Sequence, residues 1–165
     1  NGTIPWINSG EVNKSRITQA TELITPLALE KSATKLLELR STILAITGAT
    51  LGQVSLTEIE CCANQSVIAI YDQDKLLNEY IFLRITRDIN KIIALAGGGA
   101  QQHINKEVIE DRKILIPDEP TSSEFRSIVS PMFDLIAALM RANHGLSQTR
   151  DLLIRQMIST KRIAS

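Results

Sequence analysis

Apolar and polar positions follow different spacings before and after residues 117–120, a segment that begins and ends with proline. Before that segment, short apolar runs rich in β-branched residues stop at glycines or polar residues. Runs of this kind are typical of buried or half-buried strands. We therefore expect strands at residues 42–47, 53–56, 66–71 and 112–116.

Helical spacing appears between the last two of these strands. Leu77, Ile81, Ile85 and Ile89 continue into Ile92 and Ile93 along one apolar side, which predicts a helix over residues 75–96 ended by the glycines at 97–99. Shorter helices are expected at residues 26–33 and 105–110. Strands and helices that alternate without a regular strand–helix–strand rhythm predict an α+β fold with a mixed sheet.

After residue 120, apolar positions recur at alternating spacings of three and four. This heptad seam predicts a long coiled-coil-type helix over residues 120–160, after a domain at 1–119 and before a tail at 161–165. Either the helix kinks at Pro131, or Ser130 caps a new helix that begins there. A terminal helix folded back on the domain is the simpler alternative to a helix that protrudes and packs against a partner. The seam consists of Phe125, Ile128, Met132, Leu135, Leu139, Ala142, Leu146, Thr149, Leu153 and Gln156.

Charge and cysteine content narrow the class of protein. The chain has 18 basic and 18 acidic residues, which argues against an isolated high-affinity DNA binder but not against DNA binding within a larger complex. Cys61 and Cys62 are adjacent, too close for an unstrained disulfide, so we expect buried, reduced thiols. Without a secretory signal or a membrane-spanning run, we expect a cytoplasmic protein.

Signatures of catalysis are missing from the sequence. Residues 48–52 lack the ending of a phosphate-binding loop, residues 97–100 are not a dinucleotide fingerprint, and no nucleophile elbow or metal-ligand spacing occurs. The motif with which amino-methyltransferases hold a flipped adenine is absent as well. We therefore expect no catalytic residues, no metal site and no cofactor of the chain's own.

Polar side chains gather instead in loops bounded by glycines. Glycine lets a backbone approach a phosphate, and Gln or Asn can pair with adenine through two hydrogen bonds. Each loop by itself is equally consistent with an ordinary polar turn. The predicted DNA-contacting residues are Asn8, Ser9, Thr47, Ala49, Thr50, Gln53, Asn64, Gln65, Gly98, Gly99, Gln101, Gln102, His103 and Asn105.

Several segments occur in an order and at a spacing that can be compared with known families. The first, at residues 2–12, reads Gly-Thr-Ile-Pro-Trp-Ile-Asn-Ser-Gly-Glu-Val, and others lie at residues 35–37, 42–54, 64–70, 101–106, 112–117 and 146–159. Together the segments cover nearly the whole chain, although each alone is modestly specific. Their order and spacing resemble the specificity subunits of type I restriction–modification systems, and the last segment looks like the end of that family's spacer helix.

The resemblance implies a function in sequence-specific DNA recognition. Members of the family carry two target-recognition domains held apart by two long antiparallel helices, and each domain reads one half of a bipartite target on double-stranded DNA. Modification subunits assemble on them and methylate adenine at N6, and restriction subunits join. S-adenosylmethionine, ATP and magnesium belong to those partner subunits, so the chain itself is expected to be non-enzymatic.

One recognition domain and one helix imply a fragment, a truncated gene product or a half-subunit. A half-subunit would form a homodimer by pairing Phe125, Ile128, Met132, Leu135, Leu139, Leu146 and Leu153 with the same helix of a second copy. The alternative from a different class is a non-enzymatic interaction or decoy module that docks a partner through the heptad helix.

Overall fold

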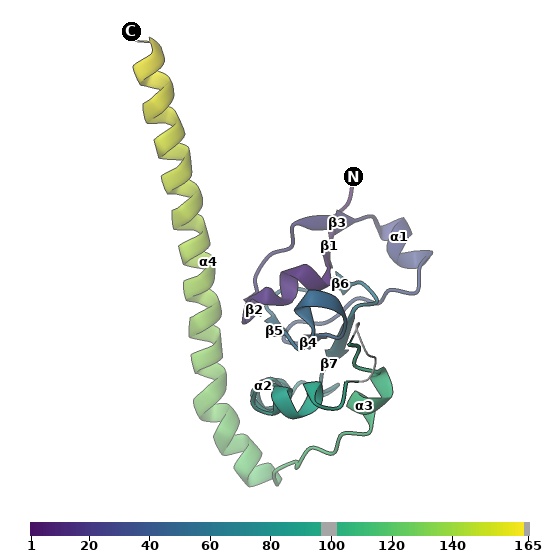
Figure 1. Ribbon diagram of the computed structural model, residues 1–165. Helices are drawn as coiled ribbons and strands as arrows, with labels where there is room; N and C mark the ends of the chain where they lie inside the picture. Colours follow the sequence, from purple (N-terminus) through teal and green to yellow (C-terminus); the bar gives the residue numbers. More distant parts are fainter. Residues whose placement is uncertain (97–101, 164–165) are drawn as a thin grey trace. The chain divides into compact units, whose positions relative to one another are not determined.

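The computed structural model describes residues 1–96 and 102–163 and forms two compact units, Asn1–Val129 and Ser130–Ser165 (Figure 1). Among its described residues, the first unit holds two small sheets, three α-helices and the first turns of a fourth. Its strands are β1 (Ile4–Ile7), β2 (Arg16–Ile17), β3 (Glu22–Ile24), β4 (Thr42–Ala45), β5 (Val54–Thr57), β6 (Cys62–Ala63) and β7 (Val67–Ile70). Its helices are the 3-10 turns η1 (Ser9–Asn13) and η2 (Gly48–Thr50), and α1 (Pro26–Glu30), α2 (Asn78–Ile93) and α3 (Lys106–Glu110).

Both sheets are mixed, as the sequence predicts. One has the order β3-β1-β6, with β1 antiparallel to β3 and parallel to β6. The other has the order β2-β5-β4-β7, with β4 antiparallel to β5 and β7 and β2 parallel to β5. The α+β fold class is confirmed. The strands predicted at residues 42–47, 53–56 and 66–71 are confirmed as β4, β5 and β7, and all three lie in the second sheet.

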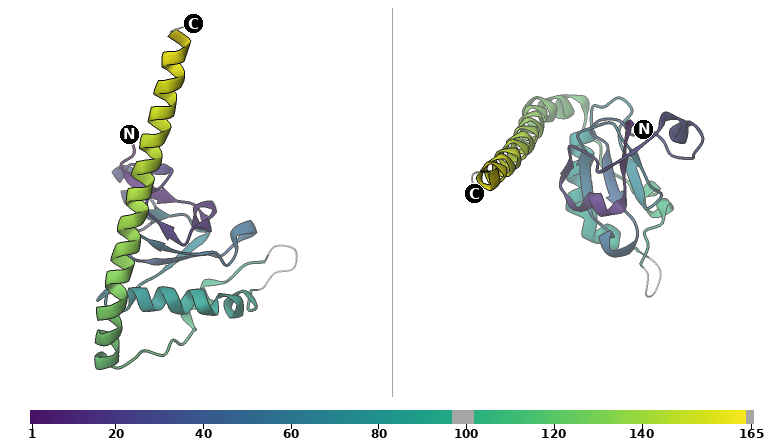
Figure 2. Two further views of the ribbon diagram at one scale, coloured as in Figure 1. Left: turned by 90° about the vertical axis from the view of Figure 1, so that its left-hand side faces the viewer. Right: turned by 90° about the horizontal axis from the view of Figure 1, so that it is seen from above.

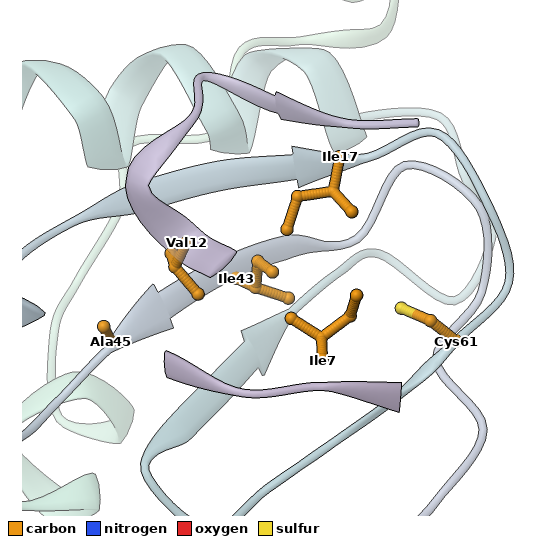
Figure 3. Close-up of a cluster of buried hydrophobic side chains, with 6 residues drawn as sticks. All are labelled: Ile7, Val12, Ile17, Ile43, Ala45 and Cys61. Atoms are coloured by element: carbon orange, nitrogen blue, oxygen red, sulfur yellow. The ribbon is translucent and has the colours of Figure 1, made fainter. Parts of the chain in front are cut away.

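Strand β4 is the centre of the domain, because both of its faces are covered. Neighbouring residues of a strand point to opposite faces, so Ile43 and Ala45 lie on one face and Leu44 on the other. Ile43 and Ala45 join a cluster with Ile7 and Ile17, and Figure 3 shows these side chains gathered between β1 and β4. Leu44 joins a second cluster with residues of α2. This explains why every residue of β4 is buried.

Helix α2 lies where the apolar spacing predicts a helix, but it begins at Asn78 rather than at residue 75. The delay has a local cause. The carboxylate of Asp72 accepts hydrogen bonds from the backbone N–H groups of Leu76 and Leu77, and Lys75 has a positive φ of 58°. These contacts form a turn that precedes the helix. The glycines expected to end it, at 97–99, lie outside the described residues.

The prediction of a strand at residues 112–116 is wrong. This segment forms neither strand nor helix. It runs beside α2, where the guanidinium of Arg112 lies 3.5 Å from the carboxylate of Asp88 and the backbone carbonyl of Leu115 accepts a 2.6 Å hydrogen bond from the hydroxyl of Tyr80. A strand needs a neighbouring strand edge, and these helix contacts do not provide one. Leu115 therefore remains 78% exposed despite its strand-like sequence.

Short elements account for most of what the sequence pattern missed. β1, β2, β3, β6 and both 3-10 turns are two to five residues long, which is too short for a period to be recognised. The predicted helices at 26–33 and 105–110 are confirmed as α1 and α3, although α1 ends early, at Glu30. Thr25 caps α1, since its hydroxyl oxygen accepts from the N–H of Ala28 at 3.1 Å.

The long C-terminal helix is confirmed as α4 (Glu119–Ile163). It is continuous through Pro131, so a new helix beginning at that proline, one of the two alternatives, is wrong. Seam residues from Ile128 onward are exposed, including Leu139, Leu146 and Leu153. Phe125, in the first unit, instead packs edge-on against the ring of Tyr80 with ring centroids 5.9 Å apart.

Two further expectations concern cysteines and membranes. Cys61 and Cys62 are free and buried, as predicted for reduced thiols. Burial is the largest cause that raises the pKa of Cys61 to about 12, with smaller contributions from the neighbouring Cys62 and from Glu11. No helix among residues 1–96 and 102–163 is long and apolar enough to cross a membrane.

Candidate nucleic-acid interface

The loops that carry the predicted contact residues emerge from one end of the two sheets, here called the loop end. Strands β1, β4 and β6 finish there, and β5 and β7 begin there. Two backbone hydrogen bonds connect the loops: the N–H of Asn64 donates to the carbonyl of Ile7 at 3.0 Å, and the N–H of Ile46 donates to that of Ser66 at 2.9 Å. The topology therefore gathers loops that are up to about sixty residues apart in sequence.

The segment after residue 101 joins the same end of the domain. Thr47 and His103 form an isolated antiparallel bridge, and the N–H of Ile104 donates to the carbonyl of Ile46 at 3.0 Å. Ile104 is fully buried, which anchors the segment, whereas Gln102 and Asn105 on either side of it are exposed. The predicted contact residues Gly98, Gly99 and Gln101 lie outside the described residues.

A glycine allows the η2 turn to pack closely against α2. Gly48 and Gly52 have positive φ values of 69° and 82°, a backbone region that favours glycine. A Cβ added to Gly52 would lie 2.3 Å from Cδ1 of Ile93, whereas one added to Gly48 would meet no atom within 4 Å. Gly52 therefore allows a close approach to α2, and Gly48 leaves open space above the turn. The left view in Figure 2 shows η2 and the C-terminal end of α2 on the same side of the domain.

Some predicted contact residues use their polar atoms within the fold. The side-chain oxygen of Asn8 accepts from the N–H of Gly10 at 2.8 Å and caps η1, and that of Asn64 accepts from the N–H of Ser66 at 3.1 Å. The hydroxyl of Thr50 donates to the carbonyl of Thr47 at 3.4 Å. The side-chain oxygen of Gln53 is buried without a hydrogen-bond partner among the described residues. Asn8, Thr50 and Asn64 therefore contribute to the shape of the loops, whereas Gln53 forms no such hydrogen bond through its oxygen.

Other members of the set present uncommitted groups at the surface. Gln65, Gln102 and Asn105 are exposed, and among the described residues their side chains have no hydrogen-bond partner. Amide side chains of this kind offer a donor and an acceptor side by side. Ser9, Thr47 and His103 are half-buried, and Ala49 is exposed. The structure therefore separates the predicted set into residues that shape the loops and residues that are available for a ligand.

A pocket of about 370 Å³ opens beside Asn64 and Gln65. Trp6, Thr34 and Lys35 are among its other lining residues, and the hydroxyl of Thr34 donates to the carbonyl of Ala63 at 3.1 Å. Sequence reasoning did not assign Trp6, Thr34 or Lys35 to the site, because nothing in their spacing connects them with residue 64. The parallel pairing of β1 with β6 brings Trp6 to this position.

Glu11, an acidic residue close to the loop end, is engaged in hydrogen bonds within the fold. Oε1 of Glu11 accepts hydrogen bonds from both the backbone N–H and the hydroxyl of Thr21 at 2.9 Å, and Oε2 accepts from the N–H of Asn8 at 3.3 Å. These contacts fix η1 and use both oxygens of the Glu11 carboxylate. No cluster of residues among the described ranges could hold a metal ion. The predicted contact residues of the loop end thus carry amide, hydroxyl and imidazole groups, with Lys35, Lys106 and Glu107 as charged neighbours.

Comparison with known proteins identifies relatives over most of the chain. The model of a family described as type I restriction modification DNA specificity domain matches residues 1–146. The specificity subunit of the type I restriction enzyme MjaIX from Methanocaldococcus jannaschii is 24% identical over 163 residues, which are 96% of this chain and 37% of that subunit. The EcoR124I/EcoR124II specificity subunit from Escherichia coli is 26% identical over 123 residues, 72% of this chain and 30% of that protein.

Two further similarities agree with these. The HindI specificity subunit from Haemophilus influenzae is 23% identical over 160 residues, 94% of this chain and 35% of the relative. A chain from a structure of type I R-M system assembly and conformational transition superimposes with a TM-score of 0.55 at 14% identity, over 86% of this chain and 34% of the other, which supports the fold. This chain spans about a third of the length of these relatives.

Proposed function

The chain belongs to the type I restriction modification DNA specificity domains, and from that premise we propose that its loop end reads the base sequence of double-stranded DNA. The loops supply recognition, and the methylation and cleavage that follow recognition belong to other subunits. The named relatives are specificity subunits of restriction enzymes, which supports a recognition role for this chain.

The convergence of the predicted contact loops at one end of the sheets is the observation that carries this proposal. Base readout requires several side chains to reach the same few base pairs, which loops on opposite sides of a domain cannot do. Gln65, Gln102 and Asn105 are exposed there and uncommitted among the described residues. Gln and Asn can each form two hydrogen bonds to adenine in the major groove.

The exposed seam of α4 supports a role in assembly. Leu139, Leu146 and Leu153 are each more than half exposed, and an apolar stripe of this length in water favours a partner. The proposed partner is α4 of a second copy, packed antiparallel, which gives a two-fold dimer with recognition domains at opposite ends. Such a dimer would read an interrupted inverted repeat whose gap depends on helix length.

Two changes test the dimer. Replacing Leu139 and Leu146 with Asp is expected to give monomers in sedimentation experiments, and inserting seven residues between them is expected to lengthen the gap without changing either half-site. A monomeric unmodified chain at high concentration would contradict the homodimer and would leave the modification subunits as the partners of the seam.

The proposed partners provide the chemistry. Modification subunits bind S-adenosylmethionine and transfer the methyl group to adenine N6, and restriction subunits bring ATP and magnesium. The chain itself holds none of these groups under this proposal. It acts in the cytoplasm, where the DNA of a bacterial or archaeal cell lies.

Methylation mapping tests the function directly. Genomes are compared from cells that carry the modification subunits with and without this chain, and a bipartite adenine-methylation motif is expected only when the chain is present. Identical methylation in both genomes would contradict the proposed function. A motif whose two halves are inverted copies of each other would also support the dimer.

A further inference from the structure

A stripe of basic residues runs along the outer side of α2. Arg84, Arg87 and Lys91 follow one another at spacings of three and four residues and so share one face of the helix. Arg112, from the segment beside α2, joins this face through its contact with Asp88. These four residues are called the basic stripe below.

Asp88 organises three of the four cations. Its side chain is only 7% exposed, and its carboxylate oxygens lie 3.1 Å from Nε of Arg84, 3.3 Å from Nζ of Lys91 and 3.5 Å from a guanidinium nitrogen of Arg112. Burial raises the pKa of Asp88, but hydrogen bonds from Lys91 and Arg112 and the charges of Arg84 and Lys91 outweigh it, so the pKa lies below its ordinary value. One charged carboxylate therefore fixes three cationic groups side by side.

The stripe has more positive charge than its ion pairs neutralise. Three cations face the single carboxylate of Asp88, and the exposed Arg87 has no acidic partner among the described residues. Two other lysines of the domain are paired one to one, Lys75 with Glu38 at 2.6 Å and Lys106 with Glu110 at 2.8 Å, whereas Lys14, Lys31, Lys35 and Lys113 are exposed as single charges. The stripe differs from both kinds because several cations gather around one carboxylate, in a chain whose formal net charge is zero.

We propose that the basic stripe binds phosphate groups of the DNA backbone beside the bases contacted by the loop end, an inference that rests on the proposed function. DNA-reading domains need cations that hold phosphates and so fix the register of the duplex. The predicted contact residues of the loops include no lysine or arginine. Phosphate contacts are therefore expected from cations outside that set, and the basic stripe is the largest group of them among the described residues.

Position and length both suit this role. The η2 turn of the loop end packs against Ile93 in the last turn of α2, and Lys91 lies two residues before Ile93, on the opposite face of the helix. The stripe therefore starts at the end of α2 that adjoins the loops and faces away from the side that η2 contacts. From Arg84 to Lys91 the helix rises about 10 Å, at about 1.5 Å per residue. One DNA strand advances about 3.4 Å per nucleotide along the duplex axis, so a stripe that lies along this axis covers a length of about three nucleotides.

Salt dependence of DNA binding tests the stripe. Affinity of the full chain for a duplex of random sequence is measured at several salt concentrations for the unmodified chain and for the double variant Arg87→Gln, Lys91→Gln. Removing one phosphate-binding cation is expected to reduce the slope of log affinity against log salt by about 0.9, so the double variant should lose about 2 from the slope. Thermal unfolding confirms that the variant is folded.

Lys75→Gln is the matched control. Lys75 is exposed, follows the end of β7 that lies opposite to the loop end, and is already paired with Glu38, so its replacement is expected to leave the slope unchanged. An unchanged slope for the double variant, with salt-dependent binding by the unmodified chain, overturns the stripe and leaves the proposed function intact. No salt-dependent binding by the unmodified chain overturns both. Loss of binding to purified modification subunits with an unchanged DNA slope also overturns the proposal, because the stripe is then a protein-docking surface.

Discussion

The recognition domain and helix α4 use apolar residues in opposite ways. In the domain, Leu44 and Ile43 are fully buried, and the loop end built on them presents amides and hydroxyls. In α4, Leu139 and Leu146 are exposed along a continuous helix. The difference shows that the proposed functions depend on side chains that are not packed in the core. At the loop end these are polar side chains that would contact DNA, and on α4 they are apolar side chains that would contact a partner helix.

The largest expected effect is a difference in the free energy of unfolding between a substitution in the core of the domain and one on the seam of α4. Leu44→Ala removes a fully buried side chain and is expected to lower the free energy of unfolding by about 2–5 kcal/mol. Leu146→Ala, at a side chain that is 67% exposed, should change it by less than about 0.5 kcal/mol in a chain dilute enough to be monomeric. Urea denaturation measures both. Equal losses would mean that the seam is already covered within one chain.

Gly48 and Gly52 provide a comparison of packed and open positions within the loop end. Gly52→Ala is expected to destabilise the domain by about 1–3 kcal/mol, because it combines a positive φ with a clash against Ile93. Gly48→Ala meets no neighbouring atom and should cost only about 1 kcal/mol for its positive φ. Thermal unfolding compares the two variants, and a larger loss for Gly48→Ala would contradict the described turn.

The smallest expected effect on stability concerns the buried thiol of Cys61. Because its pKa is raised to about 12 from an ordinary value of 9.0, its contribution to stability is complete below pH 9 and is lost as the pH rises from 9 toward 12. At pH 8 a thiol reagent should label Cys61 only in unfolded protein. Rapid labelling of the folded chain would show that this core opens easily.

Sequence pattern was sufficient where an element is long or its period is clear. The spacing of Ile81, Ile85 and Ile89 predicts α2, the seam predicts α4, and the β-branched run at residues 42–47 predicts β4. The prediction of a strand at 112–116 is wrong because the side-chain pattern favours an extended conformation but does not specify a neighbouring strand with which the segment can pair. Instead, the backbone carbonyl of Leu115 in this segment accepts a hydrogen bond from the hydroxyl of Tyr80 in α2.

The candidate site was predictable in composition but not in detail. Glycine-bounded polar loops are visible in the sequence, yet their convergence depends on strand pairings such as β1 with β6, which local spacing does not specify. Sequence also could not show that Asn8 and Asn64 use their oxygens within the fold while Gln65 and Gln102 remain available. The basic stripe could not be predicted from spacing because Arg112 joins it from a distant segment.

The central claim is that the exposed amides of the loop end read DNA bases, and selection from a pool of random duplexes tests it most directly. The chain, assembled with modification subunits, should enrich a defined sequence motif. The variant Gln65→Ala, Gln102→Ala should bind the pool equally well but discriminate less at one or two positions of that motif, by about 1–3 kcal/mol for each amide that pairs with a base through two hydrogen bonds. An identical motif with the variant, or no enriched motif with the unmodified chain, would contradict the account.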